Sequence, residues 1–96
     1  PLYPPFARLL RAVVADKSEQ SAKQKLEVCA TELDALRVSE PDLQIVGHGK
    51  CAIEILGGKF RFEILLCCIS HAPLIKAARI CATHGFDVDM DPINFS

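Results

Sequence analysis

The sequence predicts an α+β domain with the element order β-α-β-β-α-β, in which two helices cover one face of a four-stranded sheet. Two strand-like segments flank Gly57-Gly58, the kind of two-residue turn that a tight β-hairpin requires. Apolar residues with helical spacing occur on both sides of this hairpin, and strand-like segments open and close the chain. In the split arrangement of such a plait, the first strand and the second hairpin strand are central, and the other two strands are edges.

Size and composition favour one globular domain, residues 1–96, of which half are hydrophobic. The net charge of −1 gives no bulk attraction to nucleic acid or membrane, so any such binding has to come from local charges. The longest apolar run, residues 64–69, is far shorter than the roughly 20 residues that span a bilayer. We therefore expect no membrane contact and a cytoplasmic location.

The first half of the chain is predicted to form a strand over residues 6–14 and then a helix. Ser18 is a suitable N-cap, and the helix runs to about Arg37. Its expected buried stripe consists of Ala22, Leu26, Cys29, Leu33 and Leu36. A short strand over residues 43–46 then meets Gly47-His48-Gly49, which we expect to be a bend or bulge.

The hairpin around Gly57-Gly58 has a predicted register. The expected pairs are Leu56 with Lys59, Ile55 with Phe60, Glu54 with Arg61, and Ile53 with Phe62. One face is then apolar, with Cys51, Ile53, Ile55, Phe60, Phe62 and Ile64. The opposite face is mixed, with Lys50, Ala52, Glu54, Leu56, Lys59, Arg61 and Glu63.

The second helix is expected to begin after Ser70 and to end at Gly85. Its predicted buried stripe consists of Leu74, Ile75, Ala78, Cys81 and Ala82. The last strand, from Phe86 onward, alternates apolar residues with Asp87, Asp89 and Asp91. At about 6–7 Å intervals these carboxylates are too widely spaced to share one small cation, so we expect them to balance Arg8 or Arg11 on the neighbouring strand.

Motifs for catalysis are missing from the sequence, since no GxSxG, HExxH or phosphate-binding glycine loop is present. Gly47-His48-Gly49-Lys50 resembles the end of a phosphate loop, but it precedes a strand where such a loop precedes a helix. The five cysteines are expected to be reduced structural thiols. Cys81-x-x-His84 is half of a zinc motif without a second half, so no metal site is predicted.

Basic residues gather on the hairpin, which is the best candidate for contact with phosphates. Lys50, Lys59 and Arg61 are predicted to share one face, with Phe60 beside the turn. Such a hairpin can bind a nucleic-acid backbone without reading bases. The alternative, an ordinary charged face with Glu54 and Glu63 interleaved, stays open at this point.

Three segments appear in a characteristic order: residues 3–9 (YPPFARL), 58–62 (GKFRF) and 88–92 (VDMDP). They resemble the C-terminal domain of primosomal protein N′ (PriA), the bacterial replication-restart DNA helicase, whose ending reads YPPFxRL, GRYRxxLLLK and VDVDP. The resemblance covers essentially the whole chain. Lys59, Phe60 and Arg61 fall on the family's Arg-Tyr-Arg, and Arg8 falls on the arginine after the double proline.

The resemblance implies a fold similar to a small ribosomal-subunit protein and a non-catalytic role at the end of a longer ATP-dependent helicase. Sites for ATP, magnesium and zinc would lie upstream, with no cofactor in this chain. The implied partners are single-stranded or branched DNA, the single-stranded DNA-binding protein, other primosome proteins, and the helicase core of the same chain. The DNA-binding residues that the resemblance implies are Lys59, Phe60, Arg61 and Arg8, and Lys50 is added to them because of its predicted place on the hairpin.

The sequence also departs from the family pattern. Residues 47–52 replace a proline-rich entry to the hairpin, and His71 stands where the family has an arginine. An alternative function is therefore kept, in which the domain packs on the helicase lobes through Leu56, Leu65 and Cys67 without contacting DNA. A small-molecule regulatory domain is the third possibility, but no polar-lined pocket is evident in the sequence.

Overall fold

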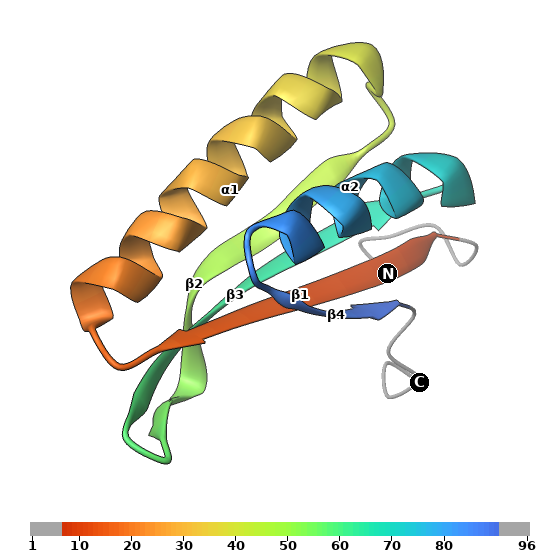
Figure 1. Ribbon diagram of the computed structural model, residues 1–96. Helices are drawn as coiled ribbons and strands as arrows, with labels where there is room; N and C mark the ends of the chain where they lie inside the picture. Colours follow the sequence, from red (N-terminus) through yellow and green to blue (C-terminus); the bar gives the residue numbers. More distant parts are fainter. Residues whose placement is uncertain (1–6, 91–96) are drawn as a thin grey trace.

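A computed structural model describes the backbone of residues 7–90, and it confirms the predicted fold class (Figure 1). The elements are β1 (Arg8–Asp16), α1 (Glu19–Ser39), β2 (Gln44–Leu56), β3 (Lys59–Cys68), α2 (His71–Thr83) and β4 (Asp87–Met90). The strand order is β2-β3-β1-β4, and each neighbouring pair is antiparallel. As predicted, β1 and β3 are central and β2 and β4 are edges. Asp91 lies outside the described residues. So do residues 1–6, where the first of the three segments that carry the resemblance begins.

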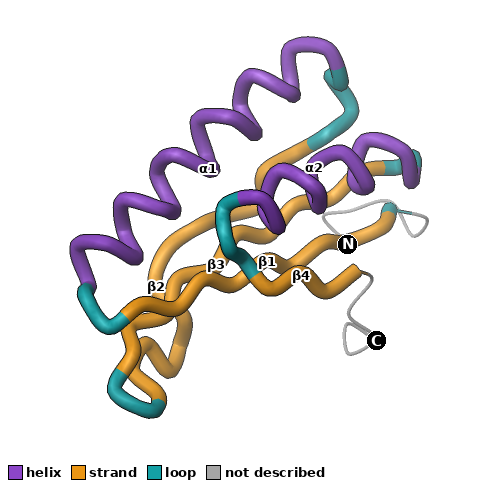
Figure 2. Tube along the Cα trace, in the orientation of Figure 1, coloured by secondary structure: helices purple, strands orange, loops and turns teal. Residues whose placement is uncertain are grey.

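Both helices pack on the same face of the sheet, and the opposite face, here called the open face, is not covered by any element of residues 7–90 (Figures 1 and 2). Alternate residues of the central strands point into the core, as strand geometry requires. Leu10, Ala12 and Val14 of β1 are buried there, and Phe62, Ile64, Leu66 and Cys68 of β3 meet them. The core therefore lies between the sheet and the helix layer.

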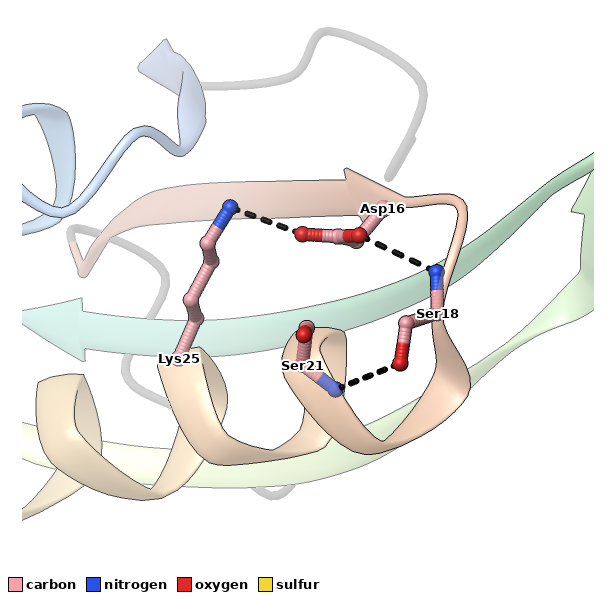
Figure 3. Close-up of polar contacts among 4 residues, drawn as sticks. All are labelled: Asp16, Ser18, Ser21 and Lys25. Carbon is pink, nitrogen blue, oxygen red and sulfur yellow. Dashed lines mark hydrogen bonds and ion pairs between the residues drawn. The ribbon is translucent and has the colours of Figure 1, made fainter.

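The start of α1 is fixed by two side chains that accept backbone hydrogen bonds (Figure 3). Ser18 Oγ accepts from the Ser21 amide at 3.2 Å, which confirms the predicted N-cap. Asp16 Oδ1 accepts from the Ser18 amide at 3.0 Å, and its other oxygen receives Lys25 Nζ at 2.9 Å. The turn from β1 into α1 is thus closed by β1's last residue.

The buried stripe of α1 agrees with the prediction, because Ala22, Leu26, Cys29 and Leu33 are buried and Leu36 packs against the core. The stripe of α2 is rotated relative to the prediction. Its buried residues are Pro73, Leu74, Ala77 and Cys81, whereas Ala82 is exposed. The side chain of Ser70 makes no capping hydrogen bond.

Gly85 ends α2 as predicted, with φ of 86°. The Phe86 amide donates to the Cys81 carbonyl and the Gly85 amide donates to the Ala82 carbonyl, both at 3.0 Å. This pair of bonds is a Schellman motif, which needs a left-handed residue at the position of Gly85. The motif turns the chain directly into β4.

The β2–β3 hairpin keeps the predicted turn but not the predicted register beyond it. Gly57 and Gly58 both have positive φ, and the Leu56–Lys59 and Ile55–Phe60 pairs are confirmed. Farther from the turn, however, Lys50 pairs with Phe62, which was expected to face Ile53. Between the Lys50–Phe62 and Ile55–Phe60 pairs, β2 advances by five residues and β3 by only two. Residues 51–54 of β2 therefore lie opposite Arg61 alone. The expected pair of Glu54 with Arg61 is therefore not formed in the ladder either.

A second irregularity lies between Ile45 and Gly47, where a bulge was expected near the glycines. Residues 44–56 nevertheless form one continuous strand, where the sequence suggested two pieces.

Candidate nucleic-acid interface

The hairpin tip carries Lys59 and Arg61 toward the same side of β3. Lys59 is exposed and directly follows the Gly57-Gly58 turn. Arg61 is half-buried on the open face, opposite Ala15 of β1. Because side chains two residues apart on a strand share a face, these two cations lie about 7 Å apart along β3. They are the two predicted site residues that the structure brings together.

Phe60 lies between these cations in the sequence but points to the opposite side of the sheet. It is partly buried and packs against the edge of the core. Its pairs are Ile55 on β2 and Asp16 on β1. In this position the ring supports the base of the hairpin, and stacking on a nucleic-acid base would require it to leave that contact.

Lys50 was expected on the same face as Lys59 and Arg61, and this expectation is wrong. Its partner Phe62 points into the core, and directly opposed residues share a face, so Lys50 lies on the helix-covered side. There its Nζ is 2.7 Å from Glu19 Oε2 in the first turn of α1. The physical reason is the odd number of extra residues in β2, since a shift of three positions reverses which side chains face the helices.

The same shift moves Cys51 from the expected core face to the open face. The Cys51 thiol is buried, and this burial, followed by the charge of Glu63, raises its pKa. Arg61 and Arg11 are close enough to oppose that increase. Its neighbours are therefore the charged residues of the open face.

Arg8 lies at the opposite end of the sheet from the hairpin. It pairs with Cys68, the last residue of β3, whereas Lys59 is the first. Nine residue steps separate these positions, or about 30 Å along the strand. Arg8 and Lys59 therefore cannot contact the same phosphate.

The open face contains an ion pair that the sequence prediction missed. Arg11 Nε donates to Glu63 Oε1 at 2.9 Å across β1 and β3. Arg11 also lies directly opposite Asp89 in the register of β1 with β4. In the sequence, the alternation of Arg11 with the apolar residues Leu10 and Ala12 indicates that Arg11 lies on the face away from the core. The ion-pair partner of Arg11 could not be predicted, because it depends on the strand register.

Next to this pair is a shallow basin of about 190 Å³, lined by Arg11, Arg61, Asp87 and Asp89 together with small apolar residues. With Glu63, the two arginines face three carboxylates, which leaves one negative charge in excess. The excess negative charge opposes an anion inside the basin, so a phosphate that reaches Arg61 would approach from the side of Lys59 at the hairpin tip.

A larger groove of about 610 Å³ lies between α1 and β2 on the helix-covered side. Leu26 and Phe62 supply its apolar lining, and its charged residues are Glu19, Lys23, Glu27 and Lys50. Two acidic and two basic side chains balance one another there, so the groove has no preference for a charged partner.

The described part of the chain contains no clustered set of metal ligands. No group of three or more His, Cys, Asp or Glu side chains is arranged to hold a metal ion within it. All five cysteines are buried and free. Among the described helices, none is long and apolar enough to cross a membrane.

Comparison with known proteins adds fold information only. No protein-family model matches the chain, and no curated protein matches its sequence. A de novo designed protein, Foldit4, is similar in structure with a TM-score of 0.64 and 7% identity, covering 88% of this chain and 92% of that one. The C-terminal domain of the MgtC protein from Mycobacterium tuberculosis has a TM-score of 0.52 and 12% identity, covering 99% and 100% of the two chains. At such identities the likeness is one of architecture.

Proposed function

We propose that this chain is a non-catalytic DNA-binding and partner-docking domain, the C-terminal domain of a replication-restart helicase, and that its β2–β3 hairpin contacts phosphates. The observation that carries this proposal is the placement of Lys59 and Arg61 on one side of β3, at the end of the hairpin. Figure 1 shows that this end of the hairpin extends beyond the start of α1. The resemblance of the three sequence segments and the β-α-β-β-α-β fold support the same function.

The two cations suit a nucleic-acid backbone in different ways. Lys59 offers a mobile point charge at the tip, whereas the planar guanidinium of Arg61 can donate two parallel hydrogen bonds to one phosphate. In the described part of the chain, Arg61 forms no ion pair that would have to break first. Contacts of this kind fix position on the backbone and carry no base specificity.

Affinity from two such contacts is low and depends strongly on salt. For single-stranded DNA the logarithm of the binding constant falls by about 0.7 per contact for each tenfold rise in salt, or about 1.4 for two. The carboxylates of Asp87 and Asp89 repel phosphate from the β4 side of the open face. DNA would therefore cross the hairpin tip and not the centre of the sheet.

The decisive experiment compares the double variant Lys59→Ala/Arg61→Ala with Lys76→Ala/Arg79→Ala, which removes the same charge from exposed positions on α2. Binding to a fluorescent forked or single-stranded oligonucleotide is measured across a salt series. We expect the hairpin variant to lose binding and the α2 variant to keep both affinity and salt slope. Equal losses in both variants would reduce the effect to net charge and remove the hairpin assignment.

A second candidate function is docking on the helicase lobes through the open face, without DNA contact. Leu65 is partly exposed on this face, and its neighbour Cys67 lies on the same side, where Cys67 Sγ is 3.9 Å from Gln44 Oε1. The side chain of Leu56, also expected in this surface, lies outside the described residues. An uncovered sheet face with apolar side chains suits a protein interface.

Leu65→Asp in the full-length parent protein tests this candidate. If the face docks on the lobes, the variant destabilises the parent protein while the isolated domain keeps its melting temperature. The reverse pattern, in which only the isolated domain is destabilised, would contradict docking.

A further inference from the structure

The two helices are joined by a close contact between cysteines from distant parts of the chain. Cys29 of α1 and Cys81 of α2 are both fully buried, and their Sγ atoms lie 3.7 Å apart. The residues are 52 positions apart in the sequence. Figures 1 and 2 show α1 and α2 side by side over the sheet, so this contact sits in the seam between the helices.

The contact shifts the pKa values of the two thiols in opposite directions. The S–H···S contact with Cys81 lowers the pKa of Cys29, although burial and the charge of Glu32 oppose this change. The same contact, followed by burial, raises the pKa of Cys81 far above the ordinary range. The sulfur–sulfur distance of 3.7 Å places each thiol within reach of the other once one of them has been oxidised.

The remaining cysteines have no comparable partner in the described part of the chain. Cys67 and Cys68 are consecutive in β3, so their side chains point to opposite faces of the sheet. Cys51 lies on the open face, separated from the helix seam by the sheet. The Cys29–Cys81 pair is therefore the contact from which a disulfide can form without rearranging the sheet.

We propose that Cys29 and Cys81 form a redox-responsive pair, which a hydroperoxide converts into a disulfide that clamps α1 to α2. The Cys29 thiolate attacks the peroxide oxygen, giving a sulfenic acid and releasing the other oxygen as water or alcohol after protonation. The Cys81 sulfur then attacks the sulfenic sulfur, its proton leaves with the hydroxyl as water, and the S–S bond forms. Two thiols are oxidised and one hydroperoxide is reduced.

Burial sets the rate of this reaction. Because neither sulfur is exposed, the oxidant reaches Cys29 only when the seam between α1 and α2 opens locally. A second pair of side chains meets at the same seam, where His84 Nε2 lies 3.0 Å from Glu32 Oε1 without forming a hydrogen bond. Once formed, the disulfide restrains α2, whose end leads through Gly85 directly into β4.

The test treats the native 96-residue chain with hydrogen peroxide, blocks remaining thiols with iodoacetamide, and maps the disulfides. Trypsin separates the cysteines into four peptides, residues 26–37, 51–59, 62–76 and 80–96. We expect a mass loss of about 2 Da before blocking and a dominant cross-link between peptides 26–37 and 80–96. Because the bond closes a long loop, the melting temperature should rise by about 10 °C and return on reduction.

Two cysteine variants test whether the disulfide joins Cys29 to Cys81. Cys81→Ser should abolish the cross-link and the rise in melting temperature, whereas Cys51→Ser should leave both unchanged. If Cys81→Ser does not fold, mapping of the unmodified chain decides alone. A dominant cross-link through peptides 51–59 or 62–76, or one that forms only in denaturant, would overturn the proposal. So would a native Cys29–Cys81 bond that lowers the melting temperature.

Discussion

Lys50 lies opposite Phe62 across β2 and β3, and its Nζ is 2.7 Å from Glu19 Oε2 on α1. The contact ties the hairpin to the first turn of the helix, where an acidic side chain also interacts favourably with the helix dipole. Lys50 thus connects two layers of the fold. It does not belong to the cation pair at the hairpin tip.

Replacing Lys50 by alanine should therefore affect stability more than DNA binding. Because both side chains of the ion pair are about half exposed, the expected loss is about 0.5 kcal/mol. Urea unfolding measures this loss, and oligonucleotide binding should stay within error of the unmodified chain. A loss of affinity as large as that of Lys59→Ala would place Lys50 back in the DNA site.

Asp16 should make stability depend on pH in the acid range. The Ser18 amide, then Lys25, lowers its folded-state pKa below the ordinary value of 3.8, so the ionised carboxylate stabilises the fold above that value. This contribution is lost as the pH falls below 3.8 and through the folded-state pKa. Asp16→Asn should be less stable near neutral pH, and the difference should shrink in acid.

The matched control is Asp42→Asn, an exposed loop residue for which a smaller difference is expected at every pH. Chemical denaturation at a series of pH values measures both variants. A deficit of Asp16→Asn that stays constant from neutral to strongly acid pH would contradict the assigned role.

Substitutions of Gly58 should destabilise the fold through backbone strain and not through steric overlap. Its φ is 77°, and a Cβ built at this position meets nothing within 4 Å. Valine strongly disfavours that conformation, whereas asparagine tolerates it. We expect Gly58→Val to cost about 1–3 kcal/mol in unfolding free energy and Gly58→Asn clearly less. Equal losses in thermal or urea unfolding would mean that the turn is not left-handed.

The pair of Arg11 and Glu63 should contribute modestly to stability. Their side chains are 37% and 26% exposed, so solvent screens much of the attraction. A double-mutant cycle with Arg11→Ala and Glu63→Ala should give a coupling of about 0.5–1 kcal/mol. The exchanged variant Arg11→Glu/Glu63→Arg should recover most of this coupling energy. If it does not, the other carboxylates of the open face favour an arginine at position 11 over one at position 63.

Many local features were predictable because they depend on neighbouring residues. The Ser18 cap, the Gly85 terminus and the Gly57-Gly58 turn each follow from backbone preferences within a few residues. The buried stripe of α1 followed from its helical period. The stripe of α2 was less accurate, because its short apolar sequence permits several rotations and packing against β1 and β4 selects one of them.

The candidate site was predictable only in part. Lys59 and Arg61 adjoin the turn, where the pairing pattern is fixed by turn geometry, and they share a face as expected. Lys50 lies beyond the three extra residues of β2, and no local signal in the sequence reveals an insertion of that length. The contact of Cys29 with Cys81 depends on how two helices, far apart in sequence, pack over the sheet.

The sequence by itself determined the order of elements, the ends of the helices and the tip of the hairpin, because local backbone energetics decide these features. The tertiary structure decided which side chains meet across strands and between helices. The physical reason is that a strand has a period of two residues, so an odd shift in one edge strand moves Lys50 to the opposite face, and only the packed core makes one register more stable than another.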